Sequence, residues 1–192
     1  MDADWSVELG SDDPALEFPW GSPDGTQRYV DLPGHPERLT EIPEAVQFPE
    51  LGEFLLAVNA ASSPWLTVKC DAWSNHELGE AEAIYEADRK LCCYIDLVAR
   101  EPARRFSFER HEAWVKSAAR AVSSDADDVI ACEFIVRRCW FHPDQRLDPA
   151  SMTLGFYVTL YLSGYGCSGT EARARWAQGL RTVTSVLTAS AV

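Results

Sequence analysis

Four long segments of the chain alternate hydrophobic and polar residues, at 65–73, 90–99, 128–142 and 152–166. A period of two places successive side chains on opposite faces, so each segment is predicted to be a β-strand. In the first strand, the pattern separates small or aliphatic residues from polar or aromatic ones. The first face receives Leu66, Val68, Cys70 and Ala72, and the second receives Thr67, Lys69, Asp71 and Trp73.

Three other segments repeat hydrophobic residues with the 3.6-residue period of an α-helix. They are 49–60, 107–122 and 171–189. Pro49 suits the first position of the first helix. Ser168 and Glu171 have the spacing of a capping box at the start of the last helix. The chain therefore combines strands and helices.

The N-terminal part of the chain has short alternating stretches separated by turn residues. Residues 16–20 and 27–32 flank the sequence GSPDGT, in which proline, aspartate and glycine favour a turn. These two stretches are predicted to form a hairpin. Residues 1–47 are acidic and rich in proline, and they are expected to form an extension with this hairpin.

From residue 65 onward, the predicted order is strand, strand, helix, strand, strand, helix. Trp73 and Trp140 each precede a hairpin loop, and Tyr94 and Tyr157 occupy similar positions in the next strands. We interpret residues 65–122 and 128–189 as two copies of one unit. The prediction is a single α+β domain spanning residues 1–192, with internal duplication, a largely antiparallel sheet and helices on one face.

The chain carries a formal net charge of −13, and most of it lies in the first 60 residues. An acidic protein repels phosphate backbones, which argues against nucleic-acid binding. No apolar run reaches the length of a membrane helix, and the acidic start differs from a signal peptide, so no membrane association and a cytoplasmic location are expected. The six cysteines are then expected to be reduced and mostly buried.

Cys139 and His142 lie three residues apart, a spacing that metal sites use. The pair supplies two ligands, whereas zinc takes three or four from the protein. No second closely spaced pair completes such a site. A packed cysteine and an exposed loop histidine are therefore the favoured interpretation, with a metal site at Cys139 and His142 as the weaker alternative. No metal and no cofactor are predicted.

One face of the predicted strands is polar yet rich in aromatic residues, which is unusual for a merely solvated face. Three explanations remain open: cover by the N-terminal segment, with Trp5, Phe18, Trp20 and Tyr29; cover by a second subunit in a homodimer; or a ligand or partner site. The candidate binding residues on this face are Asp71, Trp73, Tyr94, Asp96, Glu133, Arg137, Tyr157 and Tyr161.

No catalytic motif is present, so no catalytic residue is assigned and an enzyme is not favoured. The first hypothesis is a non-enzymatic binding or interaction module, such as an acidic adaptor or an inhibitor of a basic protein. The alternative is an enzyme or small-molecule sensor that uses the polar-aromatic face of the sheet. The sequence does not identify the partner or the ligand.

Overall fold

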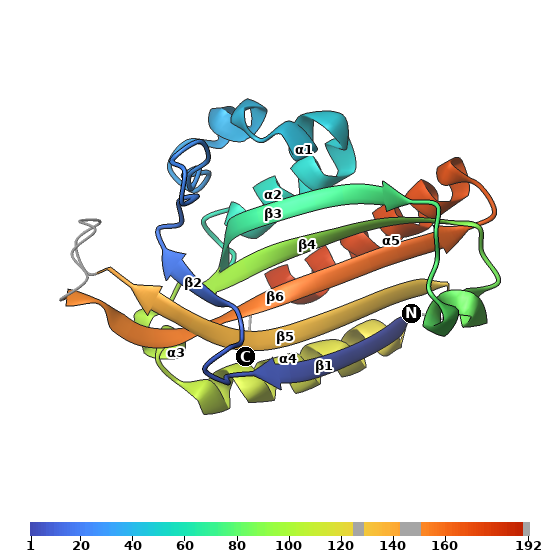
Figure 1. Ribbon diagram of the computed structural model, residues 1–192. Helices are drawn as coiled ribbons and strands as arrows, with labels where there is room; N and C mark the ends of the chain where they lie inside the picture. The colour runs from blue at the N-terminus through green and yellow to red at the C-terminus, as the bar shows by residue number, and fades with distance from the viewer. Residues whose placement is uncertain (125–128, 143–150, 190–192) are drawn as a thin grey trace.

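The computed structural model describes residues 1–124, 129–142 and 151–189. Its centre is one open sheet, and the helices lie on it (Figure 1). The strands are β1 (Asp2–Glu8), β2 (Ala15–Phe18), β3 (Trp65–Asn75), β4 (Arg89–Ala99), β5 (Ile130–Phe141) and β6 (Thr153–Gly166). The α-helices are α1 (Pro43–Gln47), α2 (Pro49–Asn59), α3 (Pro102–Arg105), α4 (Phe108–Ser123) and α5 (Gly169–Thr188), with 3₁₀ turns η1 (Pro36–Glu41) and η2 (Glu80–Tyr85).

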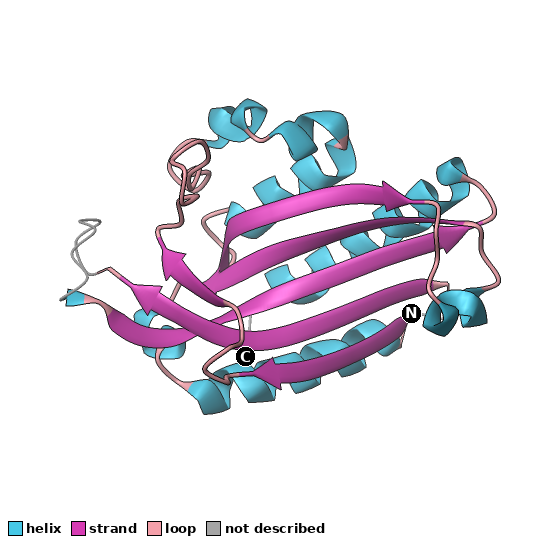
Figure 2. Cartoon of the chain, viewed as in Figure 1, coloured by secondary structure: helices cyan, strands magenta, loops and turns pink. Residues whose placement is uncertain are grey.

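The strand order is β1-β5-β6-β4-β3, and β2 joins β5 beyond the end of β1. The pairs β3–β4, β4–β6 and β5–β6 are antiparallel, whereas β1 and β2 run parallel to β5. The long helices α2, α4 and α5 lie behind the sheet in the view of Figure 2. The predicted α+β fold, with a mostly antiparallel sheet and helices on one face, is confirmed.

Serine hydroxyls cap the two long helices that cover the sheet. Ser168 is the N-cap of α5, and its hydroxyl accepts a hydrogen bond from the backbone N–H of Glu171. Ser107 caps α4 in the same way, with the N–H of Arg110 as donor. Each cap satisfies an N–H group that the helix itself leaves without a partner. None of the helices in the described ranges is long and apolar enough to cross a membrane.

The hydrophobic core lies between the sheet and these helices. Leu160 and Leu162 of β6 are fully buried against α5, where Trp176 is also inaccessible. The approach is close because Gly164 lies directly under α5: a side chain there would fall on the backbone N of Trp176 and the carbonyl of Ala172. The glycine therefore sets the distance between helix and sheet.

The predicted N-terminal hairpin forms only next to its turn. Residues 15–18 instead pair in parallel with β5. Closer to the turn the two stretches are antiparallel: Gly21 forms a bridge with Arg28, and the backbone N–H of Tyr29 donates to the carbonyl of Trp20. The edge of β5 offers Leu16 a longer ladder and a buried position, which the isolated hairpin would lack. The turn itself forms, because Asp24 accepts hydrogen bonds from Ser22 and Thr26.

The predicted face assignment in β3 is wrong before residue 69. A register shift between Thr67 and Lys69 forms a bulge, which reverses the alternation on its N-terminal side. Thr67 consequently faces the helices, where its hydroxyl and N–H bind the side chain of Asn59. Val68 instead packs in a second hydrophobic cluster on the other face. The register of β5 with β6, by contrast, is continuous.

The internal duplication is not confirmed. The order β3-β4-β6-β5 sets the two hairpins symmetrically about the centre of the sheet, as two copies would require. However, Trp73 contacts Tyr94 on the face away from the helices. Trp140 lies between Cys139 and Phe141, which both pack on that face, so its own side chain points to the opposite one. The two tryptophans are therefore not equivalent positions.

Candidate functional site

The face of the sheet opposite the helices carries a row of residues that crosses five strands. The strand registers place Asp71 beside Tyr94, Tyr94 beside Tyr161, and Tyr161 beside Glu133. Asp4 of β1 lies beside Glu133 and extends the row to the edge of the sheet. We call these five residues the central row. Carboxylates stand at both ends, and two tyrosines lie in the middle.

All eight candidate residues predicted from the sequence lie on this face, since they share its alternation along β3, β4, β5 and β6. Their exposure differs. Trp73 is 39% exposed, and Tyr94, Tyr161 and Glu133 are partly exposed. Tyr157 lies under the second hydrophobic cluster and is buried. The last two, Asp96 and Arg137, are buried as well.

The two buried charged residues belong to one hydrogen-bonded chain. The guanidinium of Arg137 donates to Glu8 at 2.7 Å and to the hydroxyl of Thr159 at 3.0 Å. Thr159 in turn donates to Asp96 at 2.7 Å. This network satisfies Arg137, which removes it from the set of groups free to hold a ligand. Its role on this face is to hold Glu8 and Thr159 in place.

Burial raises the pKa of Asp96 to about 6. The hydrogen bond from Thr159 and the charges of Lys69 and Arg137 oppose this shift and leave it incomplete. Desolvation disfavours the charged carboxylate because little water reaches it. Asp96 is therefore an acid that titrates near neutral pH directly beneath the exposed part of the face.

Cationic and aromatic side chains alternate around the central row. The ammonium of Lys69 lies 5.0 Å from the centre of the Trp20 ring and 5.3 Å from that of Tyr94. Arg137 lies 5.7 Å from the Tyr161 ring. The rings of Tyr94 and Tyr161 are 6.1 Å apart, and both remain partly accessible. Ring faces of this kind attract cations and flat apolar groups.

Two separate segments cover the ends of this face and leave the central row open. At one end, Phe18, Trp20 and Tyr29 pack on the cluster that contains Tyr157. This confirms part of the predicted cover, but the prediction is wrong for Trp5, which packs toward the helices.

At the other end, η2 brings Tyr85 against Tyr165, with ring centres 4.0 Å apart, and the Tyr85 hydroxyl donates to Asp2. The hydroxyl of Tyr165 donates to Glu82 in the same turn. This second cover was not predicted. The central row therefore lies between two ordered segments rather than on an unbounded surface.

Hollows lie at both edges of the open region. The first, of about 390 Å³, is lined by Asp2, Asp4 and Glu133 together with Tyr161 and Ser163. No ion pair within the described ranges involves its three carboxylates. The Ser6 hydroxyl donates to Glu133, and the Tyr85 hydroxyl donates to Asp2. The hollow is thus lined by carboxylates, and the N-terminal ammonium lies near Cys132, another of its lining residues.

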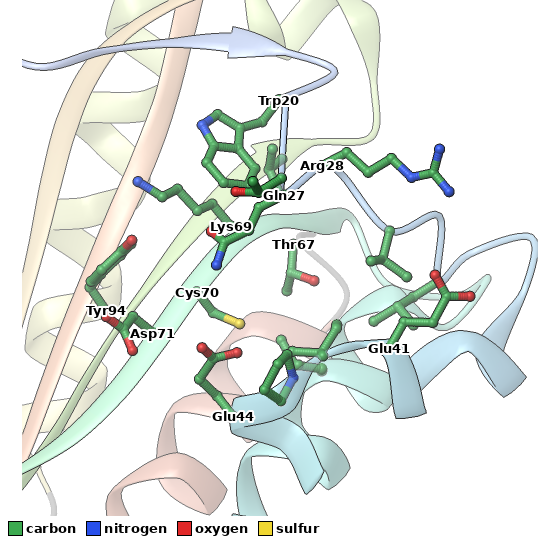
Figure 3. Close-up of a pocket in the computed structure, with 17 residues that line it drawn as sticks. Trp20, Gln27, Arg28, Glu41, Glu44, Thr67, Lys69, Cys70, Asp71 and Tyr94 are labelled. Carbon is green, nitrogen blue, oxygen red and sulfur yellow. The ribbon is translucent and has the colours of Figure 1, made fainter. Parts of the chain in front are cut away.

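The second hollow, of about 550 Å³, runs along the outer edge of β3 beneath residues 20–44 (Figure 3). Lys69 points toward Trp20 and Tyr94, whereas Cys70 points toward Glu44. Burial raises the pKa of Cys70 above its usual range, so its thiol is protonated at neutral pH. The hollow offers charged groups of both signs but no activated nucleophile among its described lining residues.

The Cys139–His142 pair does not gather a third ligand among the described residues, where no group of three metal-binding side chains occurs. Cys139 packs beside Phe141 in the second hydrophobic cluster. The prediction of an exposed histidine is wrong, because His142 is buried and its Nε2 lies 3.6 Å from Glu17. The parallel pairing of β2 with β5 brings this cover, which the local sequence does not reveal.

Sequence reasoning missed several residues of this site. Asp2, Asp4, Ser6 and Glu8 form one alternating face of β1, and this signal was present in the first eight residues. Comparison of the chain with protein-family models, with curated proteins and with solved structures gave no match.

Proposed function

We propose that this protein is a non-enzymatic binding module, an acidic adaptor or inhibitor that holds a basic partner on the central row. The observation that carries the proposal is the row itself, with two tyrosines in the middle and, at each end, carboxylates that take part in no ion pair among the described residues. Carboxylates bind ammonium and guanidinium groups, and the tyrosine faces add cation–π contacts. The net charge of −13 would draw such a partner from a distance.

The negative charge of this face also indicates which class of partner it binds. A symmetric contact between two copies would bring identical carboxylates together and would be repulsive. Nucleic acid would be repelled for the same reason. Basic protein segments are the partner class whose charge complements Asp4, Asp71 and Glu133.

A charge-placement experiment tests the proposal. Fluorescent poly-L-lysine is titrated with the protein at low and physiological salt, and anisotropy reports binding. The double variant Asp71→Asn with Glu133→Gln is compared with Asp12→Asn with Glu53→Gln, which changes the net charge equally but lies off the central row. We expect the first pair to weaken binding about three- to tenfold, as loss of two exposed charge contacts should, and the second to leave it unchanged.

Two results would contradict the proposal. Equal weakening by both double variants would mean that total charge alone attracts the polymer. If the wild-type protein did not bind poly-L-lysine at low salt, the proposal of a basic partner would be wrong. Circular dichroism melting of each variant shows whether it remains folded.

The small-molecule alternative is favoured by one observation, the 550 Å³ hollow beside β3. Its size suits a compact ligand, and Trp20, Lys69 and Asp71 provide a ring and both charges. A thermal-shift screen of small amphoteric compounds tests this alternative. A stabilising compound whose effect is lost in Lys69→Met but kept in Glu53→Gln would support it, and a screen without stabilisation would count against it.

A further inference from the structure

We infer that the partner segment is an extended chain that crosses the strands and carries two basic residues four to six positions apart. This inference rests on the proposed function and adds the geometry of the partner. It follows from the strand order, which fixes how far apart the two acidic ends of the central row lie. Asp71 is on β3, Glu133 on β5 and Asp4 on β1.

The first step is the length of the central row. Neighbouring strands in a sheet lie about 4.8 Å apart. Three such intervals separate Asp71 from Glu133, and four separate it from Asp4. The acidic ends are therefore roughly 14 and 19 Å apart along the row.

The second step is the match to a polypeptide. An extended chain advances about 3.3 Å per residue, so four residues span roughly 13 Å and six span roughly 20 Å. Even separations also place both side chains on the same side of the chain. A basic residue opposite Asp71 thus has its counterpart four positions away for Glu133, or six positions away for Asp4.

The third step favours an extended backbone over a helix. A helix satisfies its own backbone groups, whereas an extended chain presents free N–H and C=O groups that need partners. Tyr94 and Trp73 supply them: within the described ranges, neither the tyrosine hydroxyl nor the indole N–H takes part in a hydrogen bond. Both side chains are accessible from the open side of the sheet. The residue midway between the two basic ones would lie over Tyr94 and Tyr161.

The residues on either side of the central row restrict where the partner's basic side chains can lie. Lys69 and Asp96 form the next row toward the N-terminal cover, and Arg137 lies beyond them. The ammonium of Lys69 repels a basic side chain that strays from the central row, whereas Arg137 is already paired with Glu8. On the other side, η2 and Tyr165 close the face. The acidic part of the face is therefore confined to the central row, so the protein selects partners whose basic residues have the matching spacing.

The experiment uses four ten-residue peptides of identical composition, built from serine and threonine with two arginines and a fluorescent label. The arginines are two, three, four or six positions apart. We expect separations of four and six to bind about three- to fivefold more tightly than two and three, the effect of one added exposed ion pair. Asp71→Asn should abolish this preference, whereas Glu53→Gln should preserve it.

A second measurement reports position directly. On binding of the peptide with arginines four apart, the ring resonances of Tyr94 and Tyr161 should shift in NMR spectra, and the peptide with arginines two apart should shift them less. Equal binding at all four separations would overturn the extended geometry while the basic partner of the proposed function stands. Tighter binding by a helical peptide with arginines about ten residues apart would also overturn it. Absence of binding by all four peptides, with poly-L-lysine still discriminating the charge variants, would overturn the inference alone.

Discussion

Leu160 and Tyr161 are neighbours in β6, and they lie on opposite faces of the sheet with different surroundings. Leu160 is fully buried under the helices, in a core of aliphatic and aromatic side chains. Tyr161 is partly exposed, and it contacts Tyr94, Arg137 and an acidic hollow. The comparison separates two tasks within one strand: the first face holds the fold together, and the second is available for recognition.

The largest expected effect is on the helix-covered face. Gly164→Ala would place a methyl group on the backbone of α5, which cannot move without opening the core. We expect a loss of about 3 kcal/mol or more, since overpacking against a backbone is relieved only by displacing the helix. Chemical denaturation measures the free energy of unfolding. Gly169→Ala is the matched control, because a methyl group there meets nothing within 4 Å, and equal losses in both variants would contradict the explanation.

The second prediction compares the two neighbours directly. Leu160→Ala should lower the free energy of unfolding by about 2–5 kcal/mol, because it leaves a cavity in the core. Tyr161→Ala should lower it by only about 1–2 kcal/mol. Its ring is partly exposed, so the substitution removes fewer packing contacts.

The same pair should show the reverse order in binding. Tyr161→Ala is expected to weaken the interaction with poly-L-lysine, while Leu160→Val keeps it. If Leu160→Val and Tyr161→Ala weakened binding equally at temperatures where both are folded, the division of tasks between the faces would be wrong.

The difference between the faces also explains what could be predicted from the sequence. Alternation is a local property, and it correctly indicated that Asp71, Tyr94 and Tyr161 share a face. The bulge at Thr67 and the parallel pairing of Leu16 with β5 depend on tertiary contacts. Local patterns do not reveal these contacts, so the face of Val68, the pairing of residues 16–18 and the burial of His142 were predicted wrongly.

The third prediction concerns the acid beneath the central row. The pKa of Asp96 is raised from 3.8 to about 6 in the folded protein, which therefore binds more protons than the unfolded chain between these values. Stability contributed by this group consequently falls as the pH rises through that window. Asp96→Asn keeps an acceptor for the Thr159 hydroxyl and removes the buried charge. At pH 7.5 it should stabilise the protein by about 1–3 kcal/mol, given 1.36 kcal/mol per pKa unit.

The control for this prediction is the same comparison of Asp96→Asn with wild type at a lower pH. At pH 4 the wild-type carboxyl is already protonated, so the difference in melting temperature between Asp96→Asn and wild type should nearly vanish. A difference that is constant from pH 4 to 7.5 would show that the carboxylate contributes through packing or hydrogen bonding rather than through its charge.

The smallest expected effect is on the exposed carboxylates of the central row. Asp4 and Glu133 are adjacent in the β1–β5 register and share one hollow, so their like charges repel each other weakly. Glu133→Gln keeps the acceptor for Ser6 and removes one of the charges. It should stabilise the protein by no more than about 0.5 kcal/mol. In 0.5 M salt this gain should disappear, because at that ionic strength dissolved ions screen exposed charges that lie more than a few ångströms apart. A loss of stability would mean that Glu133 supports the fold, and the acidic hollow would then need no partner to explain it.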